Sequence, residues 1–290
     1  MIQIQKRNKD SKRGHLFNKG SFSAVLLNGR ASERRSRRQL HVKSILSLTE
    51  KVLFPDTCPF CEQVSETIPC ENCRKIMEEL LIKSPRCYKC GKPIRYKEQE
   101  YCSDCKKQNH VYDRGIALWL HKSPLSDALY RMKYHNRRCY APVIGERMAK
   151  GLHKWIEEVN PDVLLPVPLH RKRRRLRGYN QAELLACSIG NVLNLPVDTS
   201  ILRRVKYTNP QKKLDPIRRQ KNLQEAFAAG RVSKELKDYR KRTSARMYHA
   251  VLIIDDIYTT GNTIDAVATE LRKMGVERIY FMTASIGQGY

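Results

Sequence analysis

An apolar run that is followed by two carboxylates and a short polar turn constrains the fold of this chain more than any other segment. Residues 251–254 are continuously apolar, as in a parallel strand buried on both faces. Asp255 and Asp256 come next, and residues 264–271 then repeat apolar side chains with helical spacing. A turn at a helix N-terminus offers backbone N–H groups to a phosphate, and threonine hydroxyls add donors. The segment therefore predicts a strand–loop–helix unit of an α/β fold with a phosphate-binding loop.

This segment resembles the 5-phosphoribosyl pyrophosphate (PRPP) loop of type I phosphoribosyltransferases. The resemblance implies that Asp255 and Asp256 bind ribose hydroxyls or sit beside Mg²⁺. It also implies a cradle for the 5′-phosphate, made by Thr259, Thr260, Gly261, Asn262 and Thr263. The alternative is an ordinary strand-to-helix turn with two solvated carboxylates. Tyr258 stands where a smaller residue is frequent, and we expect its ring to face the loop.

Eight of the ten cysteines form four C-x-x-C pairs, and two such pairs complete a tetrahedral zinc site. Sequential pairing is favoured because Pro59 and Gly91 suit the turns that open each ribbon, while a cross-braced arrangement stays open. The predicted ligands are Cys58, Cys61, Cys70, Cys73, Cys87, Cys90, Cys102 and Cys105. Four protein ligands leave no open position, so both ions are predicted to be structural. Cys139 and Cys187 stand alone and are predicted to be core residues.

The formal net charge of +27 over 290 residues is extreme. It predicts an anionic partner, namely nucleic acid, an acidic membrane surface or a phosphorylated ligand, with solubility as the alternative explanation. There is no apolar run of about 18 residues, so we expect no membrane span. The basic N-terminus lacks the apolar core of a signal peptide. We therefore expect a cytoplasmic protein, and a peripheral position at the inner face of the membrane stays open.

Three parts are predicted along the chain. Residues 1–40 are a basic arm expected to be disordered, and residues 41–109 are a helix followed by a small double zinc-ribbon module, with a short helix over 74–84. Residues 110–290 alternate predicted strands and helices, which favours a parallel sheet flanked by helices. The strands are predicted at 113–120, 163–167, 251–254 and 278–284. The helices are predicted within 125–157, with a break at 135–142, and at 180–193, 217–226, 233–242 and 263–274.

The segment after the 163–167 strand is the second candidate for ligand binding. In a phosphoribosyltransferase-like sheet the loop at this place binds pyrophosphate, beyond the carboxyl ends of the strands. The candidate pyrophosphate-loop residues are Val167, Pro168, Leu169, His170, Arg177 and Gly178, and Asn180 and Gln181 are also assigned to function, with Asn180 as a helix cap.

Basic residues after this loop are candidates for nucleic-acid contacts. They are Arg171, Lys172, Arg173, Arg174 and Arg175, with Arg218 and Arg219 further along. For residues 172–175, a solvated basic loop is an equal alternative. Tyr134, Tyr179 and Tyr207 lie among basic residues and are candidates for stacking on bases. Packing within the protein is the simpler interpretation for each ring.

The order of the remaining motifs is similar to that of the ComF family, which includes ComFC and GntX-type proteins. The motifs are P-V-P-L-H from residue 166, R-G-Y-N-Q-A-E from 177, Q-x-x-L from 211, R-x-x-N-L from 219 and A-F at 226, followed by the PRPP loop. Cysteine pairs ahead of a phosphoribosyltransferase-like domain are the layout of the same family. The resemblance covers roughly residues 44–286. Tyr179 stands where phenylalanine is frequent, His135 where glycine is frequent, and the arm lies outside the family pattern.

The resemblance implies a role in natural transformation, in which the protein handles single-stranded DNA on the cytoplasmic side of the membrane. The implied partner is a helicase-like ATPase of the ComFA type. The alternative is an active phosphoribosyltransferase that acts on an unidentified base or amine acceptor, with PRPP and Mg²⁺. A weaker alternative is a regulator that senses PRPP or nucleotides.

Overall fold

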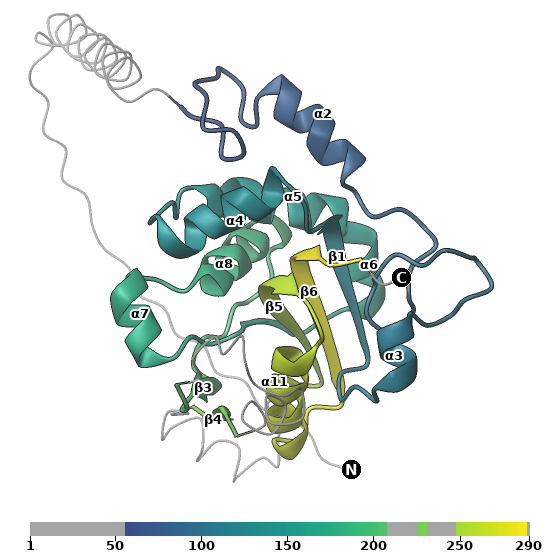
Figure 1. Cartoon of the computed structure of the whole chain (residues 1–290). Coiled ribbons are helices and arrows are strands. Elements are labelled where there is room, and N and C mark those ends of the chain that lie inside the picture. Colours follow the sequence, from purple (N-terminus) through teal and green to yellow (C-terminus); the bar gives the residue numbers. More distant parts are fainter. Residues whose placement is uncertain (1–55, 208–224, 231–247, 289–290) are drawn as a thin grey trace, which may run out of the picture. The chain divides into compact units, whose positions relative to one another are not determined.

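A four-stranded parallel sheet in the order β1-β6-β5-β2 lies at the centre of the fold (Figure 1). The computed structural model describes residues 56–207, 225–230 and 248–288, which belong to one compact unit. Several predictions lie outside these residues: the arm, the helix at the start of residues 41–109, Arg218 and Arg219, most of the helix at 217–226 and all of the helix at 233–242. The strands are β1 (Arg114–Leu120), β2 (Val163–Pro166), β5 (Ala250–Tyr258) and β6 (Arg278–Ile286).

The sheet confirms the predicted α/β class and all four predicted strands. Every neighbouring pair of strands is parallel, and β5 lies between β2 and β6. Residues 250–254 of β5 are fully buried. This burial explains why the strand is continuously apolar instead of alternating, because helices or zinc ribbons cover both faces of the sheet.

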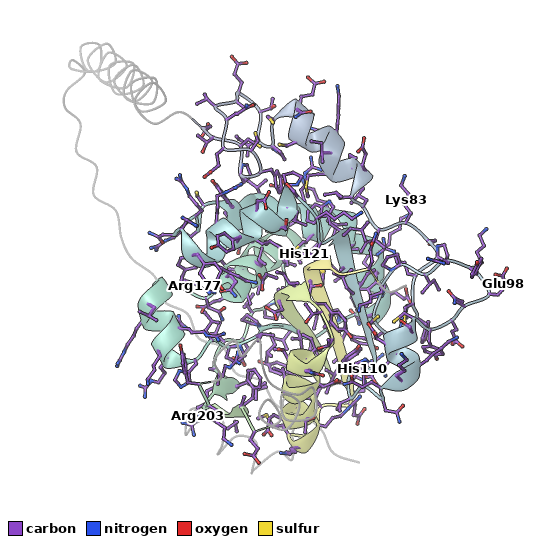
Figure 2. The ribbon with its side chains drawn as sticks, in the orientation of Figure 1. Lys83, Glu98, His110, His121, Arg177 and Arg203 are labelled. Carbon is purple, nitrogen blue, oxygen red and sulfur yellow. The ribbon has the colours of Figure 1, made fainter. Side chains whose placement is uncertain are left out.

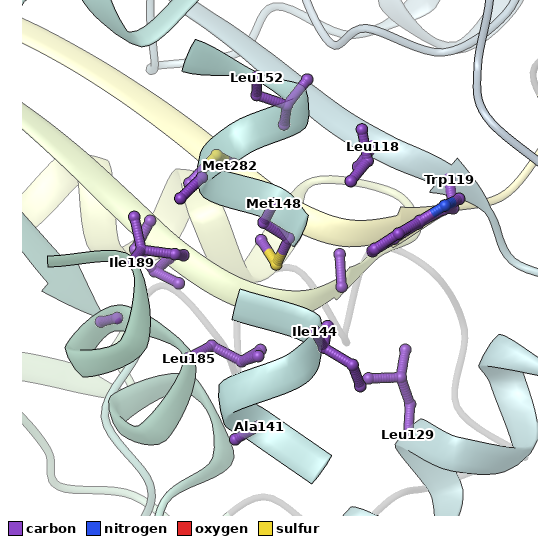
Figure 3. Close-up of a cluster of buried hydrophobic side chains, with 14 of the residues drawn as sticks. Leu118, Trp119, Leu129, Ala141, Ile144, Met148, Leu152, Leu185, Ile189 and Met282 are labelled. Carbon is purple, nitrogen blue, oxygen red and sulfur yellow. The ribbon is translucent and has the colours of Figure 1, made fainter. Parts of the chain in front are cut away.

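Two clusters of buried side chains cover the two faces. On one face the helices are α4 (Leu125–Tyr134), α5 (Tyr140–Gly151), α6 (His153–Val159) and α8 (Gln181–Leu193). The α5 and α8 helices share one buried cluster that contains Ile144, Met148, Leu185 and Ile189 (Figure 3). The predicted helix break at 135–142 is confirmed, because α4 ends at Tyr134 and α5 begins at Tyr140.

The other face is covered by α11 (Asn262–Lys273) and by the second group of cysteines, which carries the short helix α3 (Ser103–Lys107). The first group carries α2 (Glu71–Glu79) and contributes Phe60 and Met77 to the cluster under α4 and α5. The helix predicted over residues 74–84 thus corresponds to α2, which begins before residue 74 and ends before residue 84. It begins after Cys70, whose Sγ accepts from the Cys73 N–H.

The segment between the two cysteine groups extends the sheet by a short antiparallel contact. The Ile82 N–H donates to the Leu118 carbonyl at 3.0 Å, and the Leu120 N–H donates to the Leu80 carbonyl at 2.9 Å. Covering the outer edge of β1 satisfies backbone groups that otherwise invite intermolecular pairing. This contact also explains why α2 ends at Glu79, since the chain must become extended there. The predicted module boundary between residues 109 and 110 stays a prediction.

A short hairpin of β3 (Leu202–Arg204) and β4 (Phe227–Ala229) was not predicted. Each strand has three residues, which is too short for an alternating pattern to stand out. Within the described residues, no helix combines the length and apolar character that a membrane crossing requires.

The α5–α8 contact gives a direct test of the fold. We expect Ile144→Ala to lower the free energy of unfolding by about 2–5 kcal/mol, because Ile144 is fully buried and its truncation leaves a cavity. Urea titration of the zinc-loaded protein measures the change. Val192→Ala on exposed α8 surface is the control, with an expected effect within about 0.5 kcal/mol. Equal effects of the two substitutions would contradict this packing.

Candidate functional site

The carboxyl ends of β2 and β5 lie side by side, and this brings the two predicted phosphate-binding loops together. Pro166 pairs with Ile254 in register, and the Val167 N–H donates to the Ile254 carbonyl at 2.9 Å. Asp255, the next residue of β5, therefore lies at the level where the predicted pyrophosphate loop leaves β2. In open α/β sheets this edge is where ligands bind.

The turn after β5 presents a helix N-terminus. Thr259 and Thr260 are exposed, and Gly261 caps α11 with a left-handed φ of +83°. A Cβ on Gly261 would lie 2.6 Å from the Tyr258 hydroxyl and 2.9 Å from His110 Cε1, so glycine is required. The first N–H groups of a helix have no intrahelical acceptors, which suits the binding of an anion.

Tyr258 supports this turn from the core. Its side chain is buried, its ring stacks on Phe281 with centroids 4.6 Å apart, and its hydroxyl lies 2.7 Å from that of Tyr112. The expectation that Tyr258 faces the loop is therefore met only by its hydroxyl, which reaches Gly261, while the ring lies in the core. The ring turns inward because Phe281 and Tyr112 offer it a well-packed aromatic environment.

Lys133 completes the carboxylate pair, although it was not among the predicted site residues. Its Nζ lies 2.5 Å from Asp256 Oδ2, and Asp256 is only 4% exposed. A buried carboxylate needs a partner of opposite charge, and α4 supplies it from a distant part of the chain. The only signal in the sequence is a lysine in the last turn of a helix, which is too common to identify it.

The electrostatics of the pair favour a proton on one carboxyl. Burial and the charge of Asp256 raise the pKa of Asp255 to about 8, although Lys133 opposes the shift. Burial disfavours the charged form of Lys133, but Asp256 outweighs it, so the pKa of Lys133 lies above its usual value. A ribose diol or a metal ion that binds these oxygens would replace a proton, and the site is therefore coupled to pH.

The predicted basic loop is a helix, α7 (Arg171–Arg177), at the end of the pyrophosphate-loop segment. It begins where His170 Nδ1 accepts from the Lys172 N–H at 3.2 Å. It ends at Gly178, whose φ of +80° suits glycine. Arginine, lysine and leucine are good helix formers, and the two caps give hydrogen-bond partners to backbone groups at the helix ends.

Asn180 and Gln181 hold the loop in place. The Asn180 amide Nδ2 donates to the Val167 carbonyl at 3.0 Å, and its Oδ1 accepts from the Ala182 N–H, which confirms the predicted cap of α8. The Gln181 side-chain oxygen accepts from Arg177. These contacts fix the positions of the candidate residues Val167 and Arg177, and Pro168, Leu169 and His170 lie between them.

A pocket of about 550 Å³ opens beside this loop. Its walls include His170 and Arg174 from the loop and α7, and Arg203 and Arg204 from β3. Burial lowers the pKa of Arg204, as does the charge of Arg173, while the charge of Asp255 acts in the opposite direction. The β3 strand therefore adds two arginines to the pocket, and one of them, Arg204, is close enough to Asp255 to feel its charge. Arg177 and Arg203 are labelled in Figure 2.

The three candidate tyrosines divide into one buried and two exposed rings. Tyr179 is 6% exposed and its hydroxyl donates to the Met132 carbonyl, so the packing interpretation is confirmed for it. Tyr134 is 63% exposed and Tyr207 is 41% exposed, so the packing interpretation is wrong for these two rings. Both lie against basic side chains of α7.

The cysteines form two clusters with the geometry of closed zinc sites. Cys58, Cys61, Cys70 and Cys73 form one, and Cys87, Cys90, Cys102 and Cys105 the other, with the Sγ atoms of each within 4.8 Å of one another. Sulfur atoms about 3.8 Å apart are expected around tetrahedral zinc with bonds of about 2.3 Å. The Cys61–Cys70 and Cys90–Cys102 distances of 3.7 and 3.6 Å fit. Sequential pairing is therefore confirmed.

The two remaining cysteines were predicted incorrectly. Cys139 and Cys187 are both exposed. Cys139 precedes α5 in the surface segment after α4, and Cys187 lies on the outer side of α8. The apolar character of cysteine favours burial on average, but the periodicity of the flanking helices decides which face each residue takes.

The segment directly after the second zinc ribbon contacts the candidate phosphate loop and the first turn of α11. His110 Nδ1 lies 2.7 Å from Asp265 Oδ2, and the Val111 N–H donates to Asp265 Oδ1 at 2.8 Å. The Gln108 amide Nε2 donates to Asn262 Oδ1 at 3.3 Å. Figure 2 shows His110 beside α11. The segment that follows the last zinc ligand thus fixes the first turn of the helix that would bind phosphate.

Comparison with known proteins agrees with this architecture. Residues 50–106 match the double zinc ribbon domain model. The chain is 32% identical over 217 residues to competence protein F of Haemophilus influenzae, covering 72% of this chain and 86% of that protein. The chain belongs to the ComF family.

Two further relatives are more distant. The chain is 26% identical over 202 residues to DNA utilization protein YhgH of Escherichia coli, with 67% of this chain and 80% of that protein covered. It is 25% identical over 215 residues to competence protein ComFC of Bacillus subtilis, with 71% and 78% covered. A purine phosphoribosyltransferase from Pyrococcus horikoshii aligns with a TM-score of 0.28 and 18% identity, over 49% of this chain and 85% of that one. This last similarity is too low to carry weight.

The unequal contacts of the two ribbons give a testable difference. We expect Cys90→Ser and Cys61→Ser each to remove about one zinc ion per chain, since each deletes one of four ligands. Only Cys90→Ser should raise hydrogen exchange over residues 258–265, because only the second ribbon contacts that segment. Exchange mass spectrometry and zinc content measure both effects. The same exchange pattern in the two variants would show that the ribbon does not hold the loop.

Proposed function

We propose that this protein handles single-stranded DNA during DNA uptake and binds PRPP with Mg²⁺ at the carboxyl end of β5. The observation that carries the proposal is that a carboxylate pair with a buried Asp256, a helix N-terminus and a second, cation-rich segment lie at one edge of the sheet. Membership of the ComF family supports the DNA role, since relatives carry the names competence protein and DNA utilization protein.

Each part of the edge matches one part of PRPP. Asp255 and Asp256 would hold the ribose hydroxyls, directly or through Mg²⁺, since carboxylates suit both. The 5′-phosphate would lie on the N–H groups and hydroxyls of residues 259–263. The pyrophosphate would lie toward residues 167–170 and the guanidinium of Arg177, because arginine binds phosphate oxygens well.

The DNA role rests on charge. The chain carries a formal net charge of +27, and α7 places Arg171, Lys172, Arg173, Arg174 and Arg175 in two turns of helix. Contacts of these side chains with phosphates would release counterions, so affinity should fall steeply with salt. On the basis of the family resemblance we further propose a cytoplasmic location and a ComFA-type ATPase as partner.

An active phosphoribosyltransferase is the second candidate. The pocket of about 550 Å³ beside the pyrophosphate-loop residues favours it, because such a volume accommodates a base or amine acceptor. Pyrophosphate release that depends on one acceptor would establish turnover. The protein would then position PRPP and stabilise the leaving pyrophosphate.

The carboxylates allow the two roles to be separated. We expect Asp255→Asn with Asp256→Asn to weaken PRPP binding in the presence of Mg²⁺ by about tenfold or more, because charge-assisted hydrogen bonds are lost. Affinity for single-stranded DNA should change by less than about threefold, since phosphate contacts lie elsewhere. Isothermal titration calorimetry with each ligand measures both.

Asp56→Asn with Glu66→Gln is the matched control, since it removes two exposed carboxylates and makes the same change in net charge. Unchanged PRPP affinity in the Asp255/Asp256 variant would rule out the PRPP site. Equal loss of both ligands would rule out two separate sites.

The raised pKa of Asp255 predicts a pH dependence. Below a pKa of about 8 this carboxyl is protonated in the free protein, and a ligand that needs the carboxylate must displace the proton. PRPP affinity should therefore rise several-fold between about pH 7 and pH 9, by at most tenfold per unit for one proton. Lys133→Met should move this rise to higher pH, because the lysine charge lowers the pKa of Asp255. A flat profile would contradict the assignment.

A further inference from the structure

Two exposed tyrosines lie side by side on the outer face of α4. Tyr130 and Tyr134 are 56% and 63% exposed, their ring centroids are 4.8 Å apart, and His135 lies 5.6 Å from Tyr130. Residues four apart on a helix share one face, and the opposite face of α4 buries Leu129 and Met132. Among the residues that the structure describes, neither ring is part of the buried core.

Cations of α7 contact this pair at one end and a third exposed ring at the other. The Arg177 guanidinium lies 5.6 Å from the centroid of the Tyr134 ring. At the start of α7, Lys172 Nζ and the Arg173 guanidinium lie 5.5 and 5.7 Å from the centroid of Tyr207. The helix spans about 10 Å, and Figure 1 shows it between α4 and the β3–β4 hairpin.

This arrangement places exposed aromatic rings at both ends of a cationic helix. Proteins that bind single strands without sequence preference use the same combination, in which bases stack on the rings and phosphates follow the cations. A duplex keeps its bases stacked inside and cannot offer them to the rings. An acidic protein would satisfy the cations but would gain little from three exposed ring faces.

We propose that Tyr130, Tyr134 and Tyr207, together with the cations of α7, form a stacking track for the unpaired bases of single-stranded nucleic acid. The proposal rests on the proposed DNA role and assigns it to a surface. Lys133, next to Tyr134 in the chain, pairs with Asp256, so α4 carries both a part of the track and the partner of the carboxylate pair. The track itself includes neither carboxylate.

The test separates base contacts from phosphate contacts. Fluorescence anisotropy on the zinc-loaded full chain compares an oligothymidylate strand with an abasic strand of the same length. We expect Tyr130→Ala with Tyr134→Ala to weaken oligothymidylate binding about fivefold or more per tyrosine, and to leave abasic binding within about twofold. The salt dependence of binding should stay unchanged, because the phosphate contacts remain.

Matched variants identify the cause of any loss. Tyr130→Phe with Tyr134→Phe should restore binding, because the ring faces remain, whereas leucine at both positions should not. Tyr96→Ala is the control, since Tyr96 is 61% exposed on the second zinc ribbon. Lys172→Gln with Arg175→Gln should instead weaken both strands and reduce the salt dependence.

The outcomes are distinct. Wild-type protein that binds neither strand would overturn the DNA role itself. Wild-type protein that binds oligothymidylate, with affinity unaffected by the tyrosine substitutions, would overturn the track alone. Equal affinity of wild type for oligothymidylate, the abasic strand and polyglutamate would also overturn it, because charge would then suffice and an acidic protein partner would be favoured.

Discussion

The parallel pairing of β5 with β2 and β6 is the constraint on which the rest of this structure depends. It places residues 250–254 in the middle of the sheet, where both faces are covered, and fixes the register in which Pro166 lies opposite Ile254. Because the strands are parallel, both phosphate-loop candidates leave the sheet at one edge. Three features therefore lie close together without a long connecting loop: the N-terminus of α11, the two carboxylates and the start of the pyrophosphate loop. The chain belongs to the ComF family, and the segment after its second zinc ribbon holds α11 at this edge of the sheet.

The two zinc ribbons have different mechanical roles. The first packs on α4 and α5, where the Arg131 guanidinium donates to the Phe60 carbonyl at 2.8 Å and the Tyr140 hydroxyl donates to Glu62 at 2.8 Å. The second contributes Cys87, Cys90 and Cys102 to the buried cluster that also holds Tyr258 and Ile264. A zinc ribbon has little core of its own, and here each one borrows a face of the α/β sheet. The phosphate loop in turn depends on the second ribbon, through the contacts of residues 108–111 with α11.

Helix α4 links the two ligand sites of the proposal. Its inner side is apolar, its last turn places Lys133 on Asp256, and its outer side carries Tyr130 and Tyr134. Asp256 is buried, and a buried carboxylate is unfavourable without a partner of opposite charge, which Lys133 provides. The same short helix therefore supplies the partner of Asp256 and presents the candidate track for DNA.

The sequence by itself determined the strand–carboxylate–turn–helix unit, the sequential pairing favoured for the cysteines, and the α/β class. Each of these depends on residues that are close in the chain, where periodicity and spacing carry the information. Only the tertiary structure decided that Lys133 meets Asp256, that Tyr179 and Tyr258 are packed while Tyr130 and Tyr134 are exposed, and that Cys139 and Cys187 lie on the surface. The structure also shows that the expected basic loop is the helix α7 and that β3 pairs with β4. The physical reason is that burial and charge pairing arise between segments far apart in the chain, and no local pattern records which side chain will face which partner.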